Sequence, residues 1–149
     1  MNGNAKDLLP LIIADVFELA GRFRDEGETI AKTVGQTQAR WQVMSAASGD
    51  THTVPQIARR LGVTRQNVQR IADLLVKENW ASFEPNPDHK GSPYLVLNVR
   101  GRAGLAKITK AAGRNHAHLA RKLAGTDVGA LDRGLRRLIQ ALNDCDNPQ

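Results

Sequence analysis

The pattern of apolar residues predicts long helices at both ends of the chain. Over residues 6–34 the apolar positions recur at spacings of three and four, as on one face of an amphipathic helix. This first stripe consists of Leu9, Ile12, Val16, Leu19 and Phe23. Residues 99–124 repeat the spacing, and a last helix opens at Thr126 or Asp127. Its apolar positions are Leu131, Leu135, Leu138 and Leu142.

Shorter helices are predicted between the long ones. They cover residues 36–48, a short segment that ends at Leu61, and residues 65–78. Thr53 is placed to cap the short helix, because Gln56 three residues later completes a capping box. Gly62 ends that helix and Thr64 caps the next one. The apolar positions of the helix at 65–78 share one side, and they are Val68, Ile71, Ala72 and Leu75.

The segment 81–97 changes to a strand pattern. Residues 81–84 and 94–97 are typical of short strands, and the stretch 85–93 between them is rich in Pro, Asn, Asp and Gly. The segment therefore predicts one two-stranded hairpin with a long polar tip. A capped short helix, a turn, a capped longer helix and a hairpin follow one another in the order of a winged helix-turn-helix.

Charge is distributed unevenly along the 149 residues, which carry a net charge of +6. Residues 1–35 hold four basic and six acidic side chains, a net charge of −2. Residues 51–102 hold eight basic and four acidic ones, a net charge of +4. A basic middle segment indicates a polyanionic partner. The alternative is an ordinary solvated surface, which charge alone does not exclude.

Several functional classes find no support in the sequence. Cys145 is the one cysteine, so no disulfide forms within the chain and a reducing compartment is expected. No apolar run reaches the roughly 18 residues of a membrane span, and no signal layout is present, so we expect a cytoplasmic protein without membrane contact. His116 and His118 point to different helix faces, and no phosphate-binding glycine loop or nucleophile–base pair is recognisable. We expect no metal, no cofactor and no enzymatic activity.

The exposed side of the helix at 65–78 carries side chains that suit DNA. Gln and Asn bind adenine in a bidentate manner, and Arg binds guanine in the same manner. The alternative is a solvated helix face, on which Lys and Glu would be expected to dominate. Cations at the hairpin tip suit a minor groove, whose potential is negative. The candidate DNA-binding residues are Thr53, Thr64, Arg65, Gln66, Asn67, Gln69, Arg70, His89 and Lys90.

The stretch from Trp41 to Leu105 resembles the MarR family of winged-helix regulators. The residues that carry the resemblance are the paired helices at 54–68, the segment 74–80 that leads into the wing, the wing triplet Asp88-His89-Lys90, and the strand end and cap at 97–101. The resemblance implies a mainly α fold with a two-stranded β wing and long N- and C-terminal dimerisation helices. It also implies that an Asp in the wing supports a basic residue that enters the minor groove.

The resemblance further implies a homodimer and a small-molecule effector. The dimer would form through the terminal helices, with the interface residues Leu9, Ile12, Leu119, Leu123, Leu131, Leu135, Leu138 and Leu142. An aromatic or lipophilic effector would occupy a crevice lined by Phe17, Phe23, Trp41 and Met44, for which plain core packing is the alternative. In this interpretation residues 1–35 are an N-terminal dimerisation helix, 36–101 the DNA-binding lobe and 102–149 the C-terminal dimerisation helices, within one compact domain overall.

The sequence thus predicts a regulator that binds double-stranded DNA sequence-specifically, as a homodimer on a pseudo-palindromic operator. A small-molecule effector would release it from that operator. Two alternatives stay open at this point. One is an architectural or sequence-tolerant DNA-binding protein that works without an effector. The other is a winged helix that binds proteins and has lost DNA binding. The residues that argue against it, because they are expected to be exposed, are Arg65, Gln66, Asn67, Gln69 and Arg70.

Overall fold

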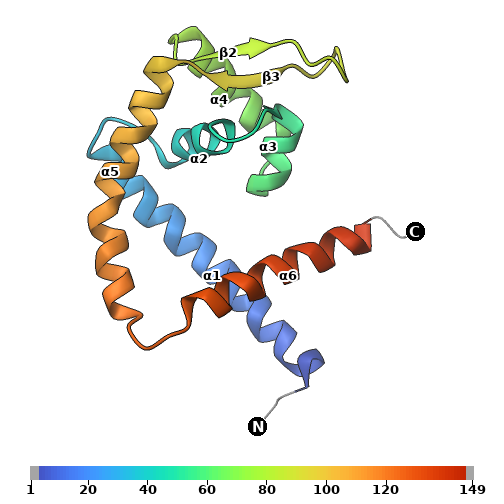
Figure 1. Cartoon of the computed structure of the whole chain (residues 1–149), viewed down its shortest axis with the longest axis vertical. Coiled ribbons are helices and arrows are strands. Elements are labelled where there is room, and N and C mark those ends of the chain that lie inside the picture. Colours follow the sequence, from blue (N-terminus) through green and yellow to red (C-terminus); the bar gives the residue numbers. More distant parts are fainter. Residues whose placement is uncertain (1–3, 147–149) are drawn as a thin grey trace. The chain divides into compact units, whose positions relative to one another are not determined.

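The computed structural model describes residues 4–146 of the chain (Figure 1). Its elements in order are α1 (Ala5–Lys32), α2 (Gln38–Ala47), β1 (His52–Thr53), α3 (Val54–Leu61), α4 (Arg65–Lys77), β2 (Ala81–Glu84), β3 (Tyr94–Leu97), α5 (Val99–Lys122) and α6 (Val128–Asp146). The chain forms two compact units, and the first ends at Ala112 while the second begins at Gly113. The boundary between the two units therefore falls inside α5.

The helix-turn-helix is delimited by the caps that the sequence predicts. The hydroxyl of Thr53 accepts a hydrogen bond from the Gln56 N–H at 3.4 Å, and the Gln56 side chain accepts one from the Thr53 N–H at 2.8 Å. Gly62 ends α3 in the left-handed conformation, with φ of 64°. The Thr64 hydroxyl accepts the Asn67 N–H at 3.2 Å and so starts α4. The predicted capping box and both helix boundaries are confirmed.

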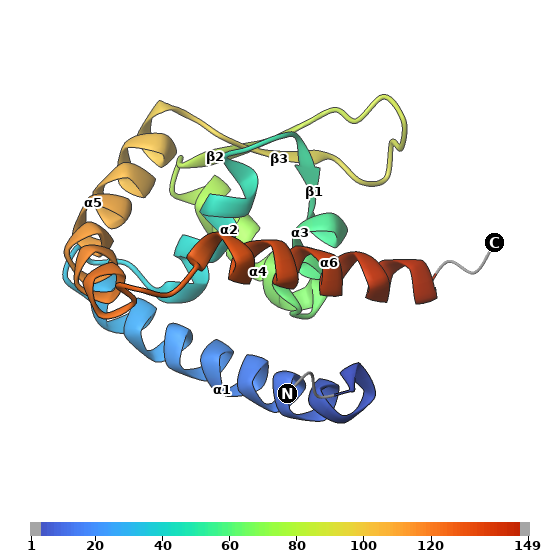
Figure 2. The ribbon, with the colours of Figure 1, turned by 60° about the horizontal axis from the view of Figure 1, so that its bottom comes forward.

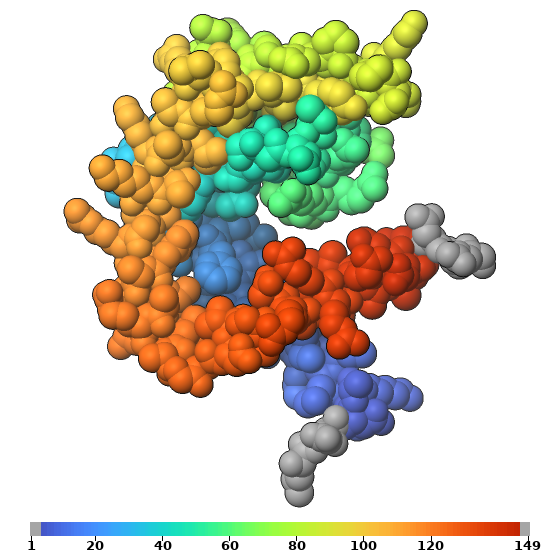
Figure 3. Space-filling model, viewed as in Figure 1, coloured from blue at the N-terminus to red at the C-terminus, as the bar shows by residue number. Residues whose placement is uncertain are grey.

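The wing belongs to a three-stranded antiparallel sheet in the order β1-β3-β2. The hairpin of β2 and β3 was predicted, but β1 was not. Its two residues pair with the central strand β3, His52 opposite Leu95 and Thr53 opposite Tyr94. A strand this short has no alternation of its own, and its partner lies far along the chain, so no local pattern marks it. The loop between β2 and β3 extends beyond the sheet (Figures 2 and 3).

One hydrophobic core holds the first unit together. It joins α2, α3, α4, the sheet and the first part of α5, and its fully buried large side chains are Met44, Ile57, Leu75, Leu95, Ile108, Val43 and Val68. All four apolar positions predicted for the inner side of α4 are buried. The outer side of that helix is therefore free to carry polar residues.

Glycines allow α5 to pack closely against the end of α4. A Cβ atom at Gly101 would lie 2.1 Å from the backbone oxygen of Trp80, and one at Gly104 would lie 2.1 Å from its indole ring. Asn79 turns the chain with a φ of 60°. The Asn98 side chain then caps α5 by accepting the Gly101 N–H at 2.9 Å. Trp80 thus fixes where α4 ends relative to the start of α5.

An ion pair joins α2 to the same corner. Arg40 donates two hydrogen bonds to the carboxylate of Glu78, at 3.1 and 2.6 Å. The hydrogen bond from Arg40 lowers the pKa of Glu78 below its ordinary value, and partial burial opposes the shift. The guanidinium groups of Arg40 and Arg100 also lie 5.4 and 5.6 Å from the centre of the Trp80 ring. Arginine side chains from two helices, α2 and α5, therefore meet at the ring of Trp80.

The second unit contains the end of α5 and the helix α6. The Asp127 carboxylate accepts the Ala130 N–H at 2.9 Å, so Asp127 rather than Thr126 caps α6. No residue of α6 is buried. Its exposed large apolar side chains are Val128, Leu131, Leu135, Ile139 and Leu142. Within residues 4–146, no helix has both the length and the apolar character that crossing a bilayer requires.

Candidate nucleic-acid interface

The outward face of α4 is polar and exposed. Arg65, Gln66, Gln69 and Arg70 all lie open to solvent, on the side opposite Val68, Ile71 and Leu75. The Thr64 cap leaves the first N–H groups of the helix near the surface, where the helix carries a partial positive charge. Two guanidinium groups, two carboxamides and a helix N-terminus therefore share one surface.

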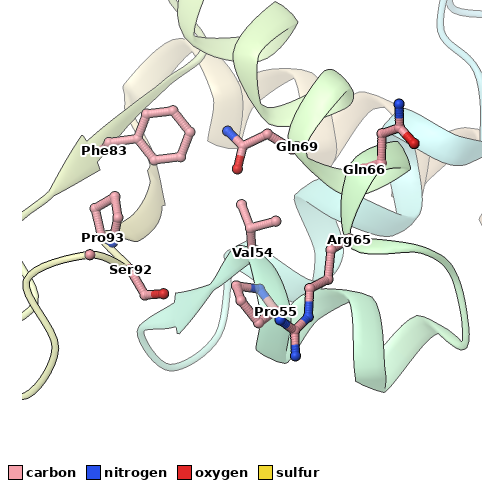
Figure 4. Close-up of a pocket in the computed structure, with 9 residues that line it drawn as sticks. Val54, Pro55, Arg65, Gln66, Gln69, Phe83, Ser92 and Pro93 are labelled. Atoms are coloured by element: carbon pink, nitrogen blue, oxygen red, sulfur yellow. The ribbon is translucent and has the colours of Figure 1, made fainter.

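A hollow of about 470 Å³ separates this face from the wing. The start of α3 provides Val54 and Pro55, α4 provides Arg65, Gln66 and Gln69, and the sheet and wing provide Phe83, Gly91, Ser92 and Pro93. Figure 4 shows Gln69 and Phe83 facing each other across the hollow, with Val54 below them. An apolar floor with a polar and cationic rim suits the edge of a base pair, which combines polar atoms with the thymine methyl group.

Hydrogen bonds within α4 orient two of these side chains. The Gln69 Nε2 atom donates to the Asp73 carboxylate at 2.8 Å. The Arg70 guanidinium donates to the Asn67 Oδ1 atom at 3.2 Å. Asn67 is half-buried and lines a different hollow, so the structure separates it from Arg65, Gln66 and Gln69. Asn67 therefore lies off the outer face, and its hydrogen bond to Arg70 connects it to a residue of that face.

The tip of the wing is braced by a residue that the sequence analysis did not single out. Asn86 is 8% exposed, and its side chain donates to the Ser92 carbonyl at 3.0 Å and accepts the Asp88 N–H at 3.0 Å. The only sequence signal was its position between two prolines, in a segment typical of Asx turns. Asn86 thus closes the loop on which the exposed His89 and Lys90 stand.

Thr53 is buried and lies apart from the exposed face of α4. Its side chain was expected at the interface, but Thr53 is only 6% exposed. Its hydroxyl is used in the capping box of α3. The same residue pairs with Tyr94 in the sheet. Because sheet and cap both draw it inward, Thr53 positions the helix-turn-helix. Thr64 is also a cap, but it remains exposed.

The four residues expected to line an effector crevice lie in different environments. A second hollow of about 410 Å³ is lined by Phe23, with Arg24, Gln38, Gln42, Leu61, Asn67 and Ile71 among the others. Met44 is completely buried, so it is a core residue and presents no surface to a ligand. Trp41 packs beside Gly27, where the ring lies 3.7 Å from the Cβ that a side chain would add. Phe17 is 74% exposed and lines neither hollow.

The residues expected at a dimer interface are accessible in the single chain. Leu9 and Ile12 on α1 are about two-fifths exposed, as is Leu119 on α5. On α6, Leu131, Leu135 and Leu142 are exposed as well. Leu123 and Leu138 are half-buried. In the part of the chain that the structure describes, no group of three or more His, Cys, Asp or Glu residues is placed to hold a metal ion.

Comparison with known proteins relates part of the chain to one family. A sequence model of the MarR family matches residues 37–90, from the α2 cap to the wing tip. The uncharacterized protein Rv2011c of Mycobacterium tuberculosis is 48% identical over 136 residues, which cover 91% of this chain and 95% of that protein. A protein of Mycobacterium bovis matches equally well.

Solved structures share the fold along almost the whole chain. The transcriptional regulator BldR of Sulfolobus solfataricus superposes with a TM-score of 0.75 at 14% identity, over 93% of this chain and 99% of BldR. The M. tuberculosis transcriptional regulator MosR, solved in complex with DNA, gives a TM-score of 0.69 at 18% identity, over 89% of this chain and 96% of MosR. Residues 37–90 therefore match the MarR family, and the chain shares the winged helix-turn-helix fold of these regulators along almost its whole length.

Proposed function

We propose that this protein binds double-stranded DNA sequence-specifically, as a homodimer on a pseudo-palindromic operator, and regulates transcription there. The observation that carries the proposal is the exposed face of α4, where Arg65, Gln66, Gln69 and Arg70 lie together beside the wing. The α/β core buries the opposite face of this helix, so the polar face is the one presented to a partner. The DNA present in the structure of MosR supports the same interpretation.

In this proposal the first turns of α4 enter the major groove. Arg65 and Gln66 stand at the helix N-terminus, whose partial positive charge favours nearby phosphates. Gln69 and Arg70 lie one turn further and reach base edges, because carboxamides and guanidinium groups match the donors and acceptors of the major groove. Phosphate contacts then fix the position, and base contacts select the sequence.

The wing contributes contacts to the neighbouring minor groove. His89 and Lys90 are exposed on a loop that extends past the sheet. A cation on such a loop is attracted to a narrow minor groove because its potential is strongly negative. Asn86 holds the loop closed and so limits the entropy that binding would cost.

Homodimerisation is supported by apolar side chains that the single chain leaves open. On α1 they run from Leu8 to Phe23, and on α6 from Val128 to Leu142. Exposed apolar surface of this extent is typical of an interface and costs free energy while it faces water. A second copy of the chain offers the same surfaces, so a symmetric dimer covers both sets at once. Two α4 helices then read two half-sites about one helical turn apart.

The proposal includes control by a small-molecule effector, which would bind in the second hollow, the one lined by Phe23. Phe23, Val43 and Ile71 give it apolar walls, and Arg24, Gln38 and Gln42 give it polar groups. A small aromatic or lipophilic molecule that carries one anionic group fits this combination. Since Asn67 and Val68 of α4 also line the hollow, an occupant would contact the base-reading helix directly. An architectural protein without an effector would bind DNA identically in the presence of such molecules.

The experiment is a selection of bound duplexes from a random library, followed by footprinting of the enriched sequence. The proposed regulator enriches a pseudo-palindrome and protects two half-sites. Enrichment of no sequence, together with binding at low salt, would instead identify a sequence-tolerant architectural protein. Absence of binding to any duplex at low salt would reject DNA binding altogether.

A further inference from the structure

One acidic side chain stands on the DNA-facing side of α4. Asp73 is the only carboxylate between Arg65 and Lys77, and it is exposed. A negative charge at this position repels phosphates, so it weakens DNA binding unless it serves another purpose. Its contact in the structure is a 2.8 Å hydrogen bond from the Gln69 Nε2 atom.

This hydrogen bond determines which way the Gln69 carboxamide points. A carboxylate has acceptors only, so the nitrogen end of the carboxamide must face Asp73. The Oε1 atom of Gln69 is then directed away from Asp73, and the second hydrogen on Nε2 stays available. Gln69 also lines the hollow between α4 and the wing, opposite Phe83 (Figure 4). The side chain therefore offers one acceptor and one donor, in a fixed order, to whatever enters.

We propose that Asp73 is a specificity-determining residue that sets Gln69 to read adenine. In the major groove adenine offers the N6 amino group as a donor and N7 as an acceptor, which match Oε1 and the remaining N–H of Gln69. Guanine offers two acceptors, N7 and O6, so its O6 would face the Gln69 oxygen and repel it. Thymine lacks the amino group, and cytosine satisfies the oxygen alone. The inference rests on the proposed DNA binding.

Without Asp73, the discrimination against guanine should weaken. The carboxamide could then rotate by half a turn and direct its NH₂ group to the guanine O6 atom. Asp73→Asn keeps the size of the side chain, but asparagine both donates and accepts, so it holds Gln69 in either orientation. Asp73→Ala removes the partner and places a strong helix former in α4. The two variants reach the same loss of orientation by different routes, and both should retain the helix.

The test is selection and sequencing of bound duplexes with the full-length protein at one fixed salt concentration. The variants compared are Asp73→Asn, Asp73→Ala, Gln69→Ala and the double variant Gln69→Ala/Asp73→Asn. Asp25→Asn is the matched control, since it makes the same charge change on the exposed side of α1. Base frequencies are read position by position, so that a general rise in affinity from the lost charge does not enter the comparison.

The expected wild-type profile contains one adenine in each half-site whose enrichment disappears in Gln69→Ala. At that position the preference for adenine over guanine should fall from about fivefold or more to about twofold or less in both Asp73 variants. The other positions and the Asp25→Asn profile should stay unchanged. In the Gln69→Ala background, Asp73→Asn should cause no further change, because the two residues act as one unit.

Two results would overturn the inference while leaving DNA binding intact. One is an unchanged adenine preference in both Asp73 variants, and the other is a Gln69-dependent position that selects a base other than adenine. A wild-type protein that enriches no sequence would overturn the proposed function and this inference together. Circular dichroism of each variant identifies any loss of folding before the profiles are compared.

Discussion

The leucines of the winged-helix lobe (residues 36–101) and those of helix α6 differ in exposure to solvent. In the lobe Leu75 and Leu95 are 0% and 1% exposed, whereas Leu131 and Leu142 on α6 are 52% and 60% exposed. The lobe satisfies its apolar residues within one chain, so its stability is expected not to depend on protein concentration. The apolar side chains of α6 and of the first half of α1 remain exposed, and in the proposed homodimer a second copy of the chain would bury them.

The largest expected effect is on the lobe. Leu75→Ala should lower the free energy of unfolding by about 2–5 kcal/mol, because it leaves a cavity in a close-packed core. Urea denaturation measures the change, which should be the same at low and high protein concentration. The matched variant Leu142→Ala should leave the lobe's unfolding unchanged and weaken only association. A concentration-dependent loss in Leu75→Ala would contradict the division between the two regions.

A charge on α6 should abolish the dimer without unfolding either region. Leu131→Asp places a carboxylate in the first turn of α6, where the helix dipole favours it, so the helix itself is not weakened. The desolvated charge would cost several kcal/mol at an interface, which shifts the protein to monomers. Sedimentation velocity measures the shift, with Asn143→Asp as a control on the same helix. A Leu131→Asp protein that still sediments as a dimer would exclude this face of α6.

A substitution on the polar face of α4 should lower the affinity for DNA and leave the stability of the lobe unchanged. Arg70→Ala should weaken binding to the selected site by about 1–3 kcal/mol if Arg70 reads a base. Its hydrogen bond to Asn67 is exposed, so the free energy of unfolding should change little. Fluorescence anisotropy with the selected and a scrambled duplex separates specific from general affinity. Equal losses on both duplexes would assign Arg70 to phosphates instead.

The wing should contribute mainly through charge. Lys90→Ala should reduce the slope of log K against log salt by about 0.9, the value expected for one lost phosphate contact. The measurement is a series of anisotropy titrations at increasing salt. Glu84→Gln, on the same hairpin, removes a charge of the opposite sign and should not reduce the slope. A Lys90→Ala slope identical to that of the wild type would remove the wing tip from the phosphate contacts.

The smallest effect concerns the Arg40–Glu78 ion pair. Because Arg40 lowers the folded-state pKa of Glu78, the pair stabilises the fold above the unfolded pKa of Glu, near 4.5, and loses that contribution as the pH falls through the lower folded value. Glu78 is nearly half exposed, so the contribution is about 1 kcal/mol at most. Glu78→Gln should flatten the acid side of the stability curve, and an unchanged curve would show that the pair contributes nothing.

Sequence reasoning succeeded where the cause is local. The Thr53 capping box, the Gly62 turn and the Thr64 cap are decided by residues within a few positions of one another, and the inner face of α4 follows from helical periodicity. Strand β1 was missed because its partner lies beyond any local window. The contact between Trp80 and Gly104 was missed for the same reason.

The candidate interface could be predicted less completely than the fold. Residues on the outer face of α4 were identified from helical periodicity. Periodicity gives neither the hydrogen bonds of a side chain nor the extent of its burial. The periodicity of α4 did not separate Asn67 from Gln69. Thr53, which precedes α3, was expected at the interface, although the cap and the sheet bury it. The contact of Asp73 with Gln69 depends on rotamers that the sequence does not specify, so no local pattern gives Asp73 a role.

The most direct test of the central claim is the stoichiometry of DNA binding. A labelled duplex with the selected pseudo-palindrome is titrated with the full-length protein well above the dissociation constant, and the molar mass of the complex is measured by light scattering. We expect saturation at two chains per duplex, with preference over a scrambled duplex. One chain per duplex, or equal affinity for both duplexes, would contradict it.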